Sequence, residues 1–307
     1  MRFPACHGIE IEPADIGLDL GWLQDRPPAS VSVEIVEELR RAAAAELVWQ
    51  LVEPPDFGLP AITTETWREA DGNTWIGNTL NMALRVDYAN AVVTVAPKNG
   101  NRQVLLEALA SLALPLLAQH RGALVLHGAA VAQRGRGILL CAVGGSGKSS
   151  LLMGLASTGW EAISEDQCVV DWDEFGSHRV WPGPSWVRLK QGVPPTTLVV
   201  GTAPRFEAVD KVAWDLAEWI AHAPAHFEKI VLLEPPGGDE VVWEALPPER
   251  AIPELASHVT WIQGREDFAP QTLPQVVRLT MEVPAFRMRL PIQEDWLEHG
   301  VALIAES

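Results

Sequence analysis

The sequence predicts an α/β fold in which a smaller mixed α/β module precedes a larger domain. Strand-like and helix-like patterns alternate along the chain, and near its middle an apolar strand leads through a glycine-rich loop into a helix. The chain has 307 residues, of which 48% are hydrophobic and 21% charged, so it can bury the core of one large or two ordinary domains. We expect the boundary near residue 102, with modules at residues 1–102 and 103–307.

The first hundred residues mix both kinds of element. Residues 31–48 carry apolar side chains near helical spacing, which predicts a helix. Alternating segments at residues 74–76, 82–86 and 91–95 predict antiparallel strands, because turn-forming residues separate them. Residues 104–119 are apolar on several faces and predict a helix buried between two layers.

Two β-like runs follow, at residues 123–132 and 137–143, and the short polar connection between them predicts a hairpin. The second run leads directly into the glycine-rich loop and a helix. A short strand at residues 161–163 is expected to end at the acidic pair Glu165-Asp166.

The rest of the chain is rich in proline and tryptophan. It predicts strands at residues 230–233, 241–243 and 276–279, and helices at residues 249–258 and 292–304. Residues 206–220 fit either a helix or a strand, and periodicity leaves both open.

The charge balance excludes some classes of function. The chain has 23 Lys plus Arg and 40 Asp plus Glu, so its net charge is 23 − 40 = −17 with His neutral. Binding of nucleic acid or anionic lipid through bulk charge needs an excess of Lys and Arg, so we expect neither partner. The uncharged run at residues 108–119 is too short to span a bilayer. Three cysteines without a C-x-x-C pair, and no apolar leader after Met1, predict a cytoplasmic protein.

The segment after the hairpin has the spacing of a phosphate-binding loop. Residues 142–149, Ala-Val-Gly-Gly-Ser-Gly-Lys-Ser, fit the Walker A pattern with Ala142 in place of the usual first glycine. Glycines let successive backbone N–H groups point at phosphate oxygens, and the following helix adds its positive N-terminal end. We expect Lys148 to bridge the β- and γ-phosphates of ATP and the Ser149 hydroxyl to ligate Mg²⁺. The predicted nucleotide-binding residues are Gly144, Gly145, Ser146, Gly147, Lys148, Ser149 and Ser150.

The alternative is a surface turn with a lone lysine, but the flanking strand and helix favour the phosphate loop.

Two carboxylates and a histidine are the other candidates for chemistry. Glu165 and Asp166 are expected where neighbouring strand ends meet near the Mg²⁺ position, unless they form a solvated acidic loop. One could orient the metal while the other accepts a proton from an attacking hydroxyl. His127 lies in an apolar strand, where a histidine is more often a hydrogen-bonded core residue than a catalyst.

The order of these features resembles the kinase domain of bacterial HPr kinase/phosphorylase and its smaller relatives. The shared features are a strand bearing His127-Gly128, a short hairpin, the loop at residues 142–149, a helix ending in Thr158-Gly159, and the acidic pair. The similarity spans about residues 124–189 and continues weakly through residues 286–291. It implies an HPr-kinase-like P-loop domain at residues 103–307, preceded by an N-terminal domain of separate origin.

The resemblance also implies transfer of the γ-phosphoryl group of ATP to a serine hydroxyl with Mg²⁺. By position, Asp166 would be the base, Glu165 would lie at the metal side, and His127 would be an accessory catalytic group. Because Glu165 stands where the family has Asp, which of the two acids ligates the metal stays open. The chain most resembles HPr-kinase-like proteins found with ribosomally made peptides, including lasso-peptide kinases that phosphorylate a C-terminal serine. A lysine recurs in those relatives, and its match here is Lys211, which favours a strand at residues 211–216.

These features together predict an ATP- and Mg²⁺-dependent serine kinase that acts on a peptide or small protein. Lys148, Asp166 and His127 are its predicted catalytic residues, and Ser149 and Glu165 its predicted metal ligands. A nucleotide-binding regulatory or scaffold protein without transfer activity and a small-molecule kinase remain alternatives, and a homo-oligomer stays open. The large aromatic rings of Trp181 and Trp186 would either belong to the core or line an acceptor groove.

Overall fold

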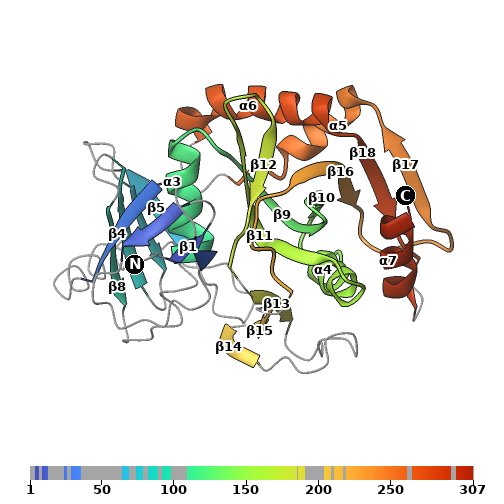
Figure 1. Cartoon of the computed structure of the whole chain (residues 1–307), viewed down its shortest axis with the longest axis horizontal. Helices are drawn as coiled ribbons and strands as arrows, with labels where there is room; N and C mark the ends of the chain where they lie inside the picture. Colours follow the sequence, from blue (N-terminus) through green and yellow to red (C-terminus); the bar gives the residue numbers. More distant parts are fainter. Residues whose placement is uncertain are drawn as a thin grey trace, which may run out of the picture.

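The computed structural model describes residues 4–6, 9–12, 24–25, 29–35, 64–68, 74–78, 82–88, 92–97, 109–184, 186–190, 204–208, 211–216, 219–260, 265–291 and 295–306. In these residues the strands pair into three sheets, and helices cover the central one (Figure 1). The predicted mixed α/β class is therefore confirmed. Residues 98–108, which include the predicted boundary at residue 102, lie outside the described residues.

The N-terminal sheet is built from residues 4–97. Its strand order is β3-β1-β2-β4-β8-β7-β6-β5. The antiparallel pairing of its last four strands along the chain confirms the strands predicted at residues 74–76, 82–86 and 91–95. The strands are β1 (Pro4–Cys6), β2 (Ile9–Glu12), β3 (Gln24–Asp25), β4 (Ala29–Ile35), β5 (Thr64–Arg68), β6 (Thr74–Asn78), β7 (Met82–Asp87) and β8 (Val92–Pro97).

Strand β4 corrects the helix predicted over residues 31–48. Residues 31–35 form part of this strand, which pairs in parallel with both β2 and β8. Val31, Val33 and Ile35 alternate with polar residues, and this period of two outweighs the helical spacing read over the longer window. Residues 36–48 lie outside the described residues.

The central sheet contains seven strands among the described residues, in the order β12-β11-β9-β10-β16-β18-β17. The pairs β10–β16 and β16–β18 are parallel and the others antiparallel, so the sheet is mixed. The predicted hairpin is confirmed as β9–β10, and the strands predicted at residues 230–233 and 241–243 are confirmed as β16 and β17. The bounds are β9 (Leu124–Gln133), β10 (Arg136–Ala142), β11 (Glu161–Trp172), β12 (His178–Trp181), β16 (His226–Leu233), β17 (Val242–Leu246) and β18 (Ala285–Arg289).

Helices pack on both faces of the central sheet. One face is covered by α4 (Lys148–Ser157) and α7 (Trp296–Glu306), whose apolar side chains join those of β9 and β10 in one core cluster. The other face is covered by α5 (Pro248–Ala256) and α6 (Arg265–Glu282), as Figure 1 shows. Each Leu, Val or Ile side chain buried in these layers stabilises the fold by about 1.5–3 kcal/mol. The helices predicted at residues 249–258 and 292–304 are confirmed where the structure describes them.

Helix α3 (Leu114–His120) lies between the N-terminal and central sheets (Figure 1). A π-helical turn, Leu109–Ala113, precedes it. Leu114, Leu116 and Leu117 are buried, which confirms the second half of the predicted core helix. No helix in the described part of the chain is long and apolar enough to cross a membrane.

Helix α6 contains residues 276–279, so the strand predicted there is wrong. Val276, Leu279 and Val283 are buried, whereas Val277 is 40% and Met281 68% exposed. Buried positions separated by three and four residues are those of one helix face. The run of four mostly apolar residues was too short to separate this spacing from that of a buried strand.

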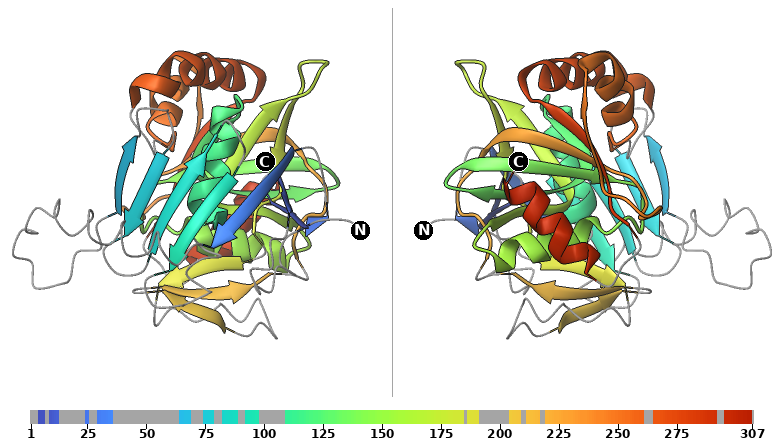
Figure 2. Two further views of the ribbon diagram at one scale, coloured as in Figure 1. Left: turned by 90° about the vertical axis from the view of Figure 1, so that its left-hand side faces the viewer. Right: turned by 90° about the vertical axis from the view of Figure 1, so that its right-hand side faces the viewer.

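A small third sheet has the strand order β13-β15-β14, with β13 (Trp186–Lys190), β14 (Pro204–Ala208) and β15 (Lys211–Asp215). Both of its strand pairs are antiparallel. The ambiguous segment at residues 206–220 therefore contains strands, and the strand interpretation of residues 211–215 is confirmed. Figures 1 and 2 place this sheet at the opposite end of the molecule from α5 and α6.

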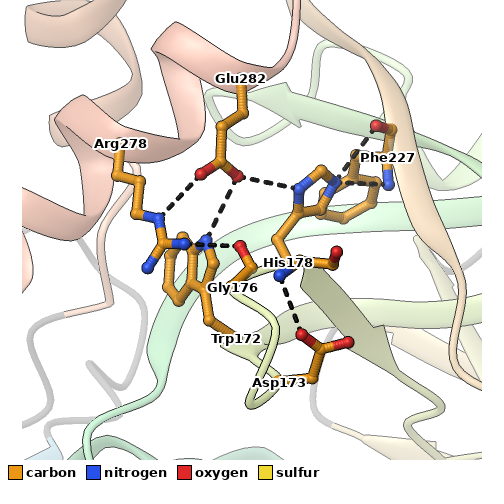
Figure 3. A network of polar contacts seen from close by, with 8 residues as sticks. Trp172, Asp173, Gly176, His178, Phe227, Arg278 and Glu282 are labelled. Atoms are coloured by element: carbon orange, nitrogen blue, oxygen red, sulfur yellow. Dashed lines mark hydrogen bonds and ion pairs between the residues drawn. The ribbon is translucent and has the colours of Figure 1, made fainter.

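A polar network ties α6 to the hairpin of β11 and β12, as Figure 3 shows. Glu282 accepts hydrogen bonds from Arg278 Nε at 2.8 Å and from Trp172 Nε1 at 3.3 Å. His178 Nε2 accepts from the backbone N–H of Phe227 at 2.9 Å, so Nδ1 carries the proton that faces Glu282 Oε2 at 3.2 Å. The network joins four elements of the fold, α6, β11, β12 and β16.

Candidate active site

A pocket of about 410 Å³ opens beside the glycine loop, by which we mean residues 143–147. Its walls come from five regions that are distant in sequence: β9, the loop with the start of α4, β11, the small sheet, and the first residue of α7. The side chains and loop residues that line it are His127, Val143, Gly144, Gly145, Gly147, Lys148, Ser149, Ser150, Glu165, Asp166, Arg188, Leu189, Lys190, Lys211 and Trp296.

The glycine loop turns sharply between β10 and α4. Gly145 and Gly147 have φ of +87° and +88°, which only glycine adopts without strain, whereas Gly144 has an ordinary φ. Gly147 is the N-cap of α4, and its carbonyl accepts the N–H of Leu151 at 2.9 Å. A Cβ on Gly147 would lie 2.7 Å from the ring of Trp296, so the loop packs directly against this indole.

Six of the seven predicted nucleotide-binding residues line the pocket, and Ser146 does not. Its side chain is buried, and its Oγ has no hydrogen-bond partner. Ser146 therefore belongs to the turn rather than to the pocket wall.

Strand β11 is longer than predicted, and this moves the acidic pair from a strand end to the middle of a strand. It continues through Val169 and Val170 to Trp172, because β-branched and aromatic residues sustain an extended backbone. It runs antiparallel to β9, with Asp166 opposite Gly128, so β9 separates it from the loop-bearing strand β10. The expected meeting of neighbouring parallel strand ends is therefore wrong, although the acids still reach the pocket.

Both acids reach the pocket because the backbone of β11 is irregular just before the acidic pair and at Asp166. The register with β9 shifts between Ala162 and Ser164, and Asp166 has φ of +76°. The Ser164 hydroxyl donates to the backbone carbonyl of Gln167 at 2.6 Å and so spans the distorted segment. A bulge of this kind redirects side chains relative to a regular strand. Both acids thus contribute to one pocket although they are consecutive in a strand.

The two acids share one guanidinium. Arg188 donates a short hydrogen bond to Asp166 Oδ2, and its Nε lies 3.6 Å from Glu165 Oε2. Burial raises the pKa of Glu165 above its ordinary value, against the opposing effect of Arg188. For Asp166, burial also raises the pKa, but Arg188, His127, Lys148 and Lys211 together lower it below the ordinary value. Asp166 is therefore the carboxylate that stays ionised.

His127 connects Lys148 to Asp166. Lys148 Nζ lies 2.9 Å from His127 Nε2, and because an ammonium can only donate, Nε2 accepts. The ring proton is then on Nδ1, which faces Asp166 Oδ1 at 3.3 Å. Burial and the charge of Lys148 lower the pKa of His127, which keeps the ring neutral. His127 is thus a polar member of the site rather than a core residue.

Gly128 is required next to His127 because a Cβ there would lie 3.0 Å from the Leu140 carbonyl oxygen. The close approach of β9 to β10 therefore explains the glycine of the His-Gly pair seen in the sequence.

The side chains at the start of α4 and on β11 suit a hard divalent cation. Ser149 Oγ donates to Glu165 Oε1 at 2.9 Å, so a hydroxyl and a carboxylate oxygen lie side by side at the pocket wall. The described residues contain no cluster of three or more His, Cys, Asp or Glu that could hold a metal by itself. Mg²⁺ normally takes one or two protein oxygens and completes its shell with water and substrate phosphates. The residues present therefore fit Mg²⁺ bound together with a phosphate-bearing ligand.

Six pocket residues were not predicted as site residues: the apolar Val143 and Leu189, and Arg188, Lys190, Lys211 and Trp296. One feature of the sequence could have identified Arg188, namely a charged residue between the apolar Val187 and Leu189. Lys211 was noted only through the resemblance. Trp296 is separated from the loop by most of the domain, so no local pattern could place it there. Trp181 and Trp186 are buried and do not line the pocket, so they are core residues.

The part of the chain that contributes most of the residues lining this pocket is similar to a known family. The family profile described as SynChlorMet cassette protein ScmC matches residues 93–203. No curated protein matches significantly. Among solved structures, the Hpr(Ser) kinase/phosphatase from Coxiella burnetii matches at 10% identity with a TM-score of 0.33, covering 59% of this chain and 88% of that chain. The chain is therefore similar to ScmC proteins over a segment that includes the glycine loop, both acids and Arg188.

Proposed function

We propose that this protein transfers the γ-phosphoryl group of ATP to a serine hydroxyl of a peptide or small protein, with Mg²⁺. One observation carries the proposal: the ionised carboxylate of Asp166 lies in the same pocket as the glycine loop, Lys148 and Ser149. A phosphate site and a base that share a pocket are the parts that phosphoryl transfer needs. The resemblance to HPr-kinase-like proteins supports the same reaction.

In this proposal the loop N–H groups and Lys148 hold the phosphates, and Ser149 and Glu165 hold Mg²⁺. When bound, Mg²⁺ neutralises charge on the phosphate oxygens. Asp166 orients the acceptor hydroxyl and takes its proton as the new O–P bond forms and the bond to the bridging oxygen of ADP breaks. Arg188 and His127 position the carboxylate, because each of them contacts one of its two oxygens.

A matched pair of variants tests the base. Asp166→Asn removes the charge in the pocket, whereas Asp171→Asn removes a charge on the same strand, where Asp171 pairs with Arg179 outside the pocket. Each protein is incubated with Mg-ATP and a panel of serine peptides, including peptides with a C-terminal serine. Phosphoryl gain is measured by mass spectrometry, and ATP binding by calorimetry.

We expect Asp166→Asn to lose about 100-fold or more of the transfer rate while binding ATP normally, and Asp171→Asn to transfer normally. Lys148→Ala should lose both transfer and tight ATP binding. Near-normal transfer by Asp166→Asn would show that Asp166 is not the base. ATP binding by the wild type without transfer to any acceptor would instead support a nucleotide-binding regulator.

A further inference from the structure

The small sheet presents positive charge to the pocket in an unusual arrangement. In the antiparallel pair of β13 and β15, Lys190 lies directly opposite Lys211. Arg188 is two residues from Lys190 and therefore on the same face of β13. All three line the pocket, so this face of the small sheet forms one of its walls.

The two lysines differ from Arg188 in their partners. Arg188 binds both acids of β11, whereas neither Lys190 nor Lys211 has a carboxylate partner in the part of the chain that the structure describes. Like charges at directly opposed positions of two strands destabilise the pair. This chain carries a net charge of −17, so acidic partners are plentiful and yet absent at this pair. The arrangement is favourable when an anion in the pocket lies between the two ammonium groups.

The groups near each lysine indicate where that anion would lie. Lys190 Nζ lies 3.8 Å from the place that a Cβ on Gly145 would take, so it reaches the glycine loop. Lys211 lines the same pocket as His127 and the two acids of β11. An anion held by both lysines is therefore between the loop and the base. In a phosphoryl transfer this is where the outermost phosphate of the nucleotide lies.

We propose that Lys190 and Lys211 form a clamp for the terminal phosphate of the bound nucleotide, so that the pocket distinguishes ATP from ADP. The inference rests on the proposed function, because it needs a nucleotide in the glycine loop. It adds two further cations to Lys148 in the same pocket. The small sheet then has a direct part in the site, which its distance from the loop in sequence conceals.

The test measures binding alone and needs no acceptor. Lys190→Gln, Lys211→Gln and the double variant are titrated calorimetrically with Mg²⁺ and either ADP or a non-hydrolysable ATP analogue. Arg134→Gln serves as the control, since it also removes one positive charge but lies in the exposed turn of the β9–β10 hairpin. Lys190→Arg keeps the charge, and melting curves check that every variant is folded.

We expect each Lys→Gln variant to lose about tenfold or more in affinity for the ATP analogue and less than about threefold for ADP, as for loss of a charge-assisted hydrogen bond. Lys190→Arg and Arg134→Gln should keep the wild-type preference. Equal losses for both nucleotides, or no loss for either, would overturn the clamp. A wild type that binds neither nucleotide would overturn the proposed function itself.

Discussion

Asp166 combines an uncommon backbone conformation with a carboxylate held from two sides. A φ of +76° on a residue with a side chain costs about 1–3 kcal/mol, and here it occurs inside a strand. The same residue contacts Arg188 through one oxygen and His127 through the other. Strain of this kind persists where surrounding contacts determine the conformation, and it is concentrated at functional sites. The contacts of the Asp166 carboxylate with Arg188 and His127 thus hold the backbone of β11 in this conformation.

This strain gives a prediction on stability. Asp166→Gly and Asp166→Ala remove the same carboxylate, but only glycine relaxes at positive φ. We therefore expect Asp166→Gly to be more stable than Asp166→Ala by about 1 kcal/mol, although alanine is the better residue in ordinary backbone. Chemical denaturation of both variants measures the difference. An alanine variant as stable as the glycine variant would mean that the backbone relaxes once the carboxylate is gone.

At the scale of single residues, the sequence predicted the groups that a compact motif contains. Lys148, Ser149 and the glycines follow from one octapeptide, Glu165-Asp166 from its place after the next predicted strand, and the role of His127 only from the family resemblance. Trp296 could not be predicted, because its contact with Gly147 depends on how α7 packs on α4. Lys190 could not be predicted for a similar reason, since only the pairing of β13 with β15 brings it opposite Lys211. Spacing along the sequence identifies the residues of one motif, whereas the residues that complete the pocket walls are brought together only by the tertiary structure.

At the scale of elements, α4 and α7 approach closely enough to require glycine. A Cβ on Gly154 would lie 2.6 Å from Val301 Cγ2, and one on Gly300 would lie 2.8 Å from Leu151 Cδ2. Both glycines lie inside helices, where glycine costs about 1 kcal/mol relative to alanine. Close packing of the two helices offsets that cost.

Gly154→Ala is therefore expected to destabilise the protein by about 1–2 kcal/mol, opposite in sign to its effect on helix propensity. Val301→Ala should relieve the overlap, so the double variant should be more stable than the two single effects predict, by about 1 kcal/mol or more. Denaturation of the four proteins in this cycle measures the coupling. Additive effects would mean that α7 shifts as a whole rather than resisting the new methyl group.

The network around Glu282 gives a prediction on pH. Burial raises the pKa of Glu282, but hydrogen bonds from Arg278, Trp172 and His178 lower it below its ordinary value. A lowered pKa in the folded state means that the stabilisation is complete above the unfolded-state value of about 4.3 and is lost as pH falls through the folded value. The difference in Tm between wild type and Glu282→Gln should therefore be full at neutral pH and shrink as pH falls below about 4.

Glu306→Gln, an exposed change at the end of α7, is the control and should show little difference at any pH. A difference between wild type and Glu282→Gln that grows toward low pH would show that the carboxylate is not stabilised in its ionised form.

Elements with one clear period were predicted well, and those with competing periods were not. The hairpin β9–β10 and the strands β6–β8 have alternating or continuous apolar patterns bounded by turn residues. Residues 31–35 and 276–279 were assigned to the wrong class, because a few apolar residues fit both periods. The extent of β11 was missed because an acidic pair looks like the end of a strand, whereas Arg188 compensates its charge from another sheet.

At the scale of the whole molecule, acidity and a basic pocket wall coexist. The net charge of −17 implies mutual repulsion over the surface, which opposes the compact state. We expect the Tm of the wild type to rise between about 10 and 150 mM NaCl, as screening weakens this repulsion. Potassium chloride at equal ionic strength should have the same effect. A falling Tm would mean that the ion pairs contribute more than the repulsion costs.

The α/β class could be predicted from alternating patterns, but the arrangement of the strands could not. Strand β10 lies between its hairpin partner β9 and the distant β16, and β16 lies between β10 and β18. Parallel neighbours of this kind are joined through long connections, so nothing in either strand identifies its partner. The small sheet depends in the same way on the pairing of β13, β15 and β14, and periodicity had left the segment at residues 206–220 open between a helix and a strand.

The contact between Trp296 and Gly147 also bears on how the site is completed during synthesis. The ribosome makes the glycine loop long before it makes α7, so the nascent loop lacks the indole that covers it in the finished fold. The acids of β11 and the lysines of the small sheet likewise emerge before Trp296. Under the proposed function, nucleotide binding by the growing chain should therefore appear late, after α7 has left the exit tunnel. ATP turnover in the proposed function would then not begin before synthesis of the chain is nearly complete.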